Sequence, residues 1–187
     1  SRPAFVRAER ANGPSEISSA EVDTFAPLSL QVEADSLLDY VEVILNRGVG
    51  IDTVLVDLLA PAARRLGEYW EDDLCDFNDV TMGLWRLQEI VHEISVRVPA
   101  GTAGAGRNRA LFASMPGDNH NFGTIVIDEV FRNNGWETDR FSEVETPDLL
   151  RYVAEGWYDM IGLTISCDCH IAALTPMIAA LRNVSRD

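Results

Sequence analysis

Apolar residues recur at helical spacing through the first half of the chain. From about Ala20 to Val96 they fall three and four positions apart, which is typical of amphipathic helices. The pattern predicts four helices: residues 22–30, strained by Pro27; residues 37–45, ending before Gly48; residues 51–70, kinked at Pro61; and residues 78–96. Four helices joined by short connections predict a bundle over residues 20–97.

The period changes after a Gly- and Ala-rich segment, residues 98–109, which we interpret as a linker between domains. Beyond it, short apolar runs alternate three times with helical patterns. We predict strands at 110–114, 136–141 and 160–166, the last one buried, and helices at 124–133, 147–155 and 171–184. This alternation is typical of an α/β fold with a parallel sheet over residues 110–187, in flavodoxin-like (Rossmann-type) order.

Three strands are few for a doubly wound sheet, so we expect the sheet to be truncated after its third strand–helix unit. The third strand would then form an open apolar edge, and open edges favour pairing. We therefore predict one of three outcomes for this edge: homo-oligomers, binding of a partner, or poor solubility. The polar residues 1–19 are predicted to be a disordered lead-in, and the missing initiator Met suggests an excised fragment.

The net charge is −15, from 30 acidic and 15 basic residues. Such a charge repels phosphate, so direct binding to nucleic acid is not expected. It suits a basic protein partner, although solubility alone also explains acidic surfaces. No apolar run is long enough for a membrane span, and no secretory signal is evident. The three cysteines suggest no disulfide framework, so the expected location is the cytoplasm.

Two polar segments follow the first and third predicted strands. They are "SMPGDNHNFG", residues 114–123, and "SCDCH", residues 166–170. In a flavodoxin-like sheet these two strands are neighbours at the point where strand order reverses, and ligands bind outside their carboxyl ends. This position makes both segments candidates for a binding site.

Asp118 and His120 offer a metal ligand with a carboxylate that could orient it. Gly123, three residues later, would let a bulky ligand or a helix backbone approach closely. The alternative is a structural turn, because Gly, Asp and Asn are common in turns. The residues alone leave both interpretations open.

The same segment resembles D-x-H-x-x-G, the lower-ligand motif of cobalamin-binding Rossmann domains, with Asp118, His120 and Gly123 at the matching positions. Those domains often follow a four-helix bundle. Their third strand carries S-x-L, where this chain has Thr164-Ile165-Ser166. This stretch of the third strand keeps a hydroxyl side chain, so Thr164 and Ser166 are candidate cofactor-binding residues.

Residues 58–88 are similar to the bundle signature of the SCHIC proteins, sensors described as containing haem instead of cobalamin. That family includes the AppA, PpaA and AerR antirepressors of photosynthesis genes. Photochemical and methyl-transferring relatives carry a Glu-His pair about ten residues after a Trp, over the upper face of the corrin. Here the Trp is Trp70, and residues 79–81 are Asp-Val-Thr, so both groups are missing.

The resemblance implies a regulator that is not an enzyme. It implies a tetrapyrrole, cobalamin or haem, with His120 as axial metal ligand, Asp118 behind it and Trp70 against the ring. The implied partner is a DNA-binding repressor of the PpsR/CrtJ type, released from its operator in response to light or redox state. Two alternatives stay open: a cobalamin-dependent methyl-transfer component, and an interaction scaffold that has lost its ligand.

Other candidates have plainer interpretations. Cys167, Cys169 and His170 could be redox-active or bind a metal, but a structural role is favoured because their spacing is not C-x-x-C and no further ligands are evident. His170 could equally begin the last helix. The acidic residues 71–79 could bind a cation but are typical of a solvated loop. Trp70 and Trp85 are typical of bundle core, and His92 of an exposed helix position.

Overall fold

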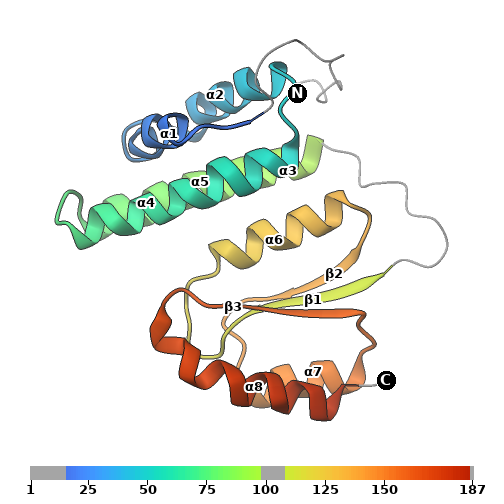
Figure 1. The fold of residues 1–187 in the computed structure, drawn as a ribbon. Coiled ribbons are helices and arrows are strands. Elements are labelled where there is room, and N and C mark those ends of the chain that lie inside the picture. Colours follow the sequence, from blue (N-terminus) through green and yellow to red (C-terminus); the bar gives the residue numbers. More distant parts are fainter. Residues whose placement is uncertain (1–15, 98–107, 186–187) are drawn as a thin grey trace. The chain divides into compact units, whose positions relative to one another are not determined.

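The computed structural model describes residues 16–97 and 108–185 (Figure 1). The chain divides into two compact units, Ser1–Pro99 and Ala100–Asp187, which are described separately below. Most of the predicted lead-in and linker, residues 1–15 and 98–107, lies outside the described residues. The first helix begins at Ser19, the last residue of the predicted lead-in.

The first unit is helical, as predicted. Its elements are α1 (Ser19–Gln31), α2 (Ala34–Asn46), α3 (Ile51–Thr53), η1 (Val54–Leu59), α4 (Ala60–Glu71) and α5 (Phe77–Arg97). The side chain of Ser18 accepts a hydrogen bond from the Glu21 N–H, and Glu21 bonds back to the Ser18 N–H. This capping box fixes where α1 begins.

The irregularity predicted at Pro61 takes the form of a π-helical segment. α3, η1 and α4 follow one another without a break, and the N–H of Ala60 donates to the carbonyl of Leu55, five residues back. Pro61 has no N–H to donate, and its ring crowds the carbonyl four residues earlier. A wider turn just before Pro61 relieves that crowding and lets the helix continue.

The core of the helical unit comes from one stripe on each helix. Its fully buried large side chains are Phe25, Leu37, Leu55, Leu58, Leu59, Leu66, Leu87, Ile90 and Ile94. Trp70 and Trp85 are not among them: they are 51% and 49% exposed, so the interpretation as bundle core is wrong for both. Both stand outside the apolar stripes that face the core.

The second unit is a parallel α/β layer structure. Its elements are β1 (Arg109–Ser114), α6 (Phe122–Asn133), β2 (Glu137–Phe141), α7 (Thr146–Glu155), β3 (Met160–Thr164), η2 (Asp168–His170) and α8 (Ile171–Val184). The strand order is β2-β1-β3, with β1 paired in parallel to both neighbours. In Figure 1, α6 covers one face of this sheet, and α7 and α8 cover the other. The predicted fold class is confirmed.

The central strand carries the core of this unit. Leu111 and Ala113 pack with Leu149, Val153 and Leu181 on the side of α7 and α8. Phe112 points to the other side, where the centroid of its ring lies 4.9 Å from that of Phe131 in α6. Side chains that alternate between two covered faces explain why β1 is buried along nearly its whole length.

The third strand differs from the prediction. It ends at Thr164 rather than Ser166, and its residues are half-buried, with Met160 38% exposed. β3 lies at an edge of the described sheet, so one of its sides has no neighbouring strand there. Pairing through this edge stays a prediction. Within the described residues, no helix is both long and apolar enough to cross a membrane.

Candidate functional site

The two polar segments meet at the carboxyl edge of the sheet. Ser114 ends β1 in register with Thr164, which ends β3, and the N–H of Met115 donates to the Thr164 carbonyl at 2.9 Å. The loop from Met115 to Asn121 therefore lies beside the segment that begins at Ile165. The prediction that the two polar segments lie together at the carboxyl ends of β1 and β3 is confirmed.

Asp118 is the polar centre of this place. Its side chain is only 1% exposed. Oδ1 accepts hydrogen bonds from the His120 N–H at 3.0 Å and the Ser166 hydroxyl at 2.9 Å, and Oδ2 accepts one from the Ser166 N–H at 2.7 Å. Burial alone raises the pKa of Asp118, but the bonds from His120 and Ser166 outweigh it and lower the pKa to about 2. The carboxylate is therefore ionised at neutral pH.

His120 is held by that carboxylate. Its Nδ1 lies 2.9 Å from Oδ1 of Asp118. Since an ionised carboxylate can only accept, Nδ1 is the donor of this pair, and in the neutral imidazole the lone pair is then on Nε2. The rest of the side chain is open, with 74% of it exposed. This arrangement presents Nε2 to solvent as a ligand atom in a fixed tautomer.

A chain of hydrogen-bonded hydroxyl groups contacts the loop that carries His120. The Ser114 hydroxyl donates to the His120 carbonyl at 3.1 Å and lies 3.1 Å from the Thr124 hydroxyl, which is 2.6 Å from that of Thr164. Ser114 and Thr124 are buried. Sequence reasoning named Thr164 but missed these two. The only signal was a pair of hydroxyl residues at the two ends of the polar segment.

Gly123 stands exposed in the first turn of α6. A Cβ placed on it would have Thr164 Cγ2 as its nearest neighbour, at 3.9 Å, which is an ordinary contact. No packing within the described part of the chain therefore requires a glycine. The open space fits the predicted approach of a ligand, whereas the alternative, close approach of a helix backbone, has no support in the structure.

Trp70 belongs to the helical unit, in the last turn of α4. Its half-exposed ring is free for an outside contact. Its predicted place against a tetrapyrrole ring stays a prediction, because the two units are described separately. Thr164 and Ser166, by contrast, belong to the sheet unit, where Ser166 bonds to Asp118 and Thr164 bonds to Thr124.

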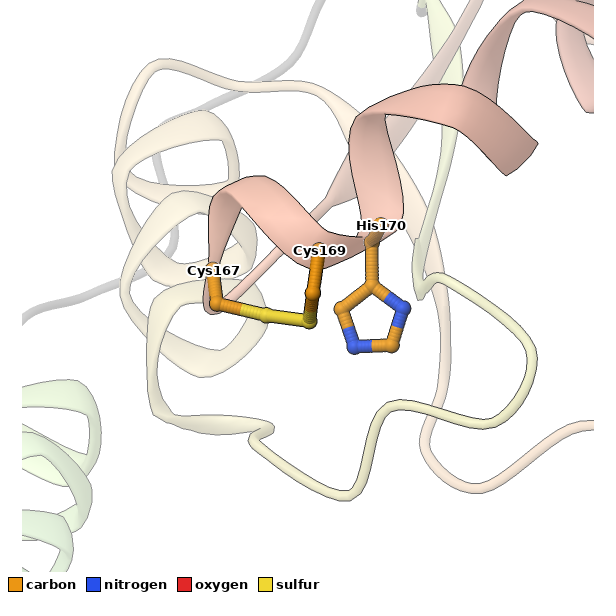
Figure 2. A group of neighbouring side chains, drawn as sticks. All are labelled: Cys167, Cys169 and His170. Carbon is orange, nitrogen blue, oxygen red and sulfur yellow. A yellow bond between two sulfur atoms is a disulfide. The ribbon is translucent and has the colours of Figure 1, made fainter.

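Cys167 and Cys169 form a disulfide, which the sequence did not predict (Figure 2). Their Cα atoms are 5.2 Å apart, a common spacing for bonded cysteines. His170 stands at the N-terminus of α8, as one interpretation held, without a capping bond from its side chain, and its Nε2 lies 3.7 Å from Oδ2 of Asp118. Cys75, in the helical unit, is a free thiol.

The acidic residues 71–79 show no metal-binding arrangement. Asp76 and Asp79 cap α5 instead, each carboxylate accepting the other residue's N–H, at 3.0 and 2.8 Å. In the part of the chain that the structure describes, only Cys167, Cys169 and His170 gather three ligand-type side chains. His92 is an exposed residue of α5, as expected.

The chain is similar to other known proteins, of which two are described here. No protein-family model matches the chain. A protein of Rhodobacter capsulatus, described as an uncharacterized 20.5 kDa protein in the bchF-crtJ intergenic region, is 22% identical over 139 residues, covering 74% of this chain and 72% of the relative. A solved structure of a cobalamin-binding protein from Desulfitobacterium hafniense DCB-2 is similar with a TM-score of 0.41 and 14% identity, covering 89% of this chain and 82% of that one.

Proposed function

We propose that the sheet unit binds a tetrapyrrole, cobalamin or haem, through its metal, with Nε2 of His120 as the axial ligand. The observation that carries this proposal is the pair formed by exposed His120 and buried Asp118. A carboxylate bonded to the far nitrogen of an imidazole fixes its tautomer and makes it a stronger ligand. Here that carboxylate is itself held by Ser166, so the imidazole is oriented before any ligand arrives.

The residues around His120 fit such a group. A planar ring needs open space beside its ligand, and Gly123 leaves that space in the first turn of α6. The metal, when bound, would supply the sensing chemistry, through its redox state or a light-sensitive axial bond. The chain's own residues would bind the metal, orient the imidazole and keep its Nδ1 protonated.

The regulatory part of the proposal is an antirepressor role. The chain would bind a DNA-binding repressor of the PpsR/CrtJ type. In response to light or redox state, this binding would lower the repressor's affinity for its operator. The R. capsulatus relative supports this, because its gene lies in the bchF-crtJ intergenic region and CrtJ is the type of partner that the sequence resemblance implies. The net charge of −15 supports a basic protein partner rather than DNA. The proposed role is not enzymatic.

Ligand binding is tested by absorption titration of the protein with hydroxocobalamin and with haemin. We expect a shifted spectrum and saturation at one equivalent with one of the two. Methyl transfer from methylcobalamin, measured in the same preparation, would instead support the methyl-transfer alternative. No spectral change with either compound would favour a scaffold without a ligand.

The partner is tested by gel shift with operator DNA and a purified repressor of the CrtJ type. The chain alone should not shift the DNA at physiological salt. Its addition should lower the repressor's affinity for the operator, and light or reduction should change the size of that effect. Tight DNA binding by the chain alone would contradict the proposal.

A further inference from the structure

A second group of ligand-type side chains lies outside the His120 site. Cys167, Cys169 and His170 follow one another in the tight turn that leads into α8 (Figure 2). Their ligand atoms all lie within 4.8 Å of one another. Both cysteines are exposed, and His170 is half-buried with 24% of its side chain exposed. The cluster is therefore open to a small ion from solvent.

The spacing suits one metal ion once the two sulfurs are not bonded to each other. In a tetrahedral zinc site with Zn–S bonds of about 2.3 Å, two thiolates lie roughly 3.8 Å apart. The three ligand atoms lie within 4.8 Å of one another, which is close to the spread that such a site needs. Two thiolates and an imidazole form a donor set that favours Zn²⁺ over the oxygen-seeking Mg²⁺ and Ca²⁺.

Two features beside the cluster favour metal binding, one by stabilising the thiolates and the other by attracting the cation. The cluster stands at the N-terminus of α8, a 14-residue helix whose dipole stabilises negative charge there. The ionised carboxylate of Asp118 has its Oδ2 3.7 Å from Nε2 of His170. This distance is too long for a hydrogen bond, but the negative charge beside the imidazole attracts a cation bound there. These two features act on different members of the cluster.

We propose that the reduced form of this cluster binds one Zn²⁺ per chain through Cys167, Cys169 and His170, with water in the fourth position. The disulfide and the metal exclude each other. Two equivalents of a thiol, which become a disulfide, supply the two electrons and two protons that convert the Cys167–Cys169 disulfide into two thiols. Zn²⁺ then displaces both thiol protons to solvent and takes a lone pair from each sulfur. The proposal does not depend on tetrapyrrole binding, although both sites border Asp118.

The test uses Co²⁺ as a spectroscopic substitute for Zn²⁺. The whole chain is reduced with a water-soluble phosphine, which becomes the phosphine oxide, and is then desalted without oxygen. Titration with Co²⁺ should give thiolate-to-cobalt charge-transfer absorption that saturates at one equivalent and is abolished by added Zn²⁺. The disulfide form should give no such absorption.

Variants locate the ligands. Cys167→Ser, Cys169→Ser and His170→Ala should each weaken Co²⁺ binding at least tenfold, whereas Cys75→Ser and His120→Ala should bind like the parent chain. Circular dichroism checks that each variant is folded. Charge-transfer absorption in the disulfide form, or its persistence in both cysteine variants of the cluster, would overturn the proposal. Its loss in Cys75→Ser or His120→Ala would do so as well.

Discussion

The backbone N–H of Ser166 donates to Oδ2 of Asp118 at 2.7 Å and so joins two loops that are 48 residues apart in the sequence. The Ser166 hydroxyl adds a second bond, to Oδ1, at 2.9 Å. Asp118 in turn holds Nδ1 of His120. The orientation of the exposed imidazole therefore depends on a residue of the neighbouring strand's loop.

Ser166→Ala removes one of these bonds and leaves the other. We expect the free energy of unfolding to fall by about 1–2 kcal/mol, because the lost hydroxyl bonds to a buried charge. Tetrapyrrole affinity should fall several-fold, since the carboxylate that orients His120 is less firmly held. Urea unfolding and absorption titration measure the two effects. Ser185→Ala is the control, because among the described residues that hydroxyl bonds to a carbonyl of its own helix. Equal effects in both variants would contradict the assignment.

Gly123→Ala separates binding from folding. The added methyl group meets no close neighbour in the described structure, and alanine favours the helix by about 0.5–1 kcal/mol over glycine. The variant should therefore be as stable as the parent chain or slightly more so, yet bind the tetrapyrrole less tightly. Gly67→Ala in α4 is a matched control with equally free space. Undiminished affinity in Gly123→Ala would show that no ligand approaches this turn.

Gly162 marks a close approach within the sheet. A Cβ at this position would lie 2.7 Å from Cδ1 of Phe112, a side chain only 1% exposed and unable to move aside. Gly162→Ala should lower the free energy of unfolding by about 1–3 kcal/mol through overpacking. The double variant with Phe112→Leu should recover part of that loss relative to Phe112→Leu alone. Additive losses in chemical denaturation would argue against the contact.

Tyr158 predicts a dependence on alkaline pH. Burial and its bond to Asp139, with an O–O distance of 2.8 Å, raise the pKa of Tyr158 to about 12. Because the folded pKa is higher than the unfolded one, its contribution to stability is complete below about pH 10 and is lost as pH rises toward 12. Urea unfolding from pH 8 to 11.5 should show a steeper loss for the parent chain than for Tyr158→Phe. If the free energy of unfolding depends on pH in the same way in both chains, the raised pKa of Tyr158 is contradicted.

The alternation of strands and helices was predictable because each apolar run is local. Ile171–Val184 was predicted to the residue, and β1 to within one. The exposure of β3 was not predictable, since an apolar run such as 160–166 has the same pattern at an edge as in the middle of a sheet. The π-helical segment before Pro61 was expected only as a kink, because sequence shows that proline disturbs a helix but not how the helix adapts.

The candidate site, like the fold, was predictable from the sequence only in part. Asp118 and His120 were predictable from their spacing and their place after a strand. Ser114 and Thr124 were missed, because their hydroxyl chain exists only once Thr164 is brought alongside by the pairing of β1 and β3. The disulfide between Cys167 and Cys169 was discounted from its spacing, although the tight turn before α8 brings the two cysteines together.

The central claim is that His120 Nε2 ligates the metal of a tetrapyrrole. The most direct measurement is absorption titration of His120→Ala with hydroxocobalamin and haemin beside the parent chain, with circular dichroism as the folding control. His92→Ala is the matched control, an exposed histidine of the helical unit. His120→Ala should stay folded and lose the spectral change and most of its affinity, while His92→Ala should bind like the parent chain. A binding curve for His120→Ala that matches the parent chain would contradict the claim.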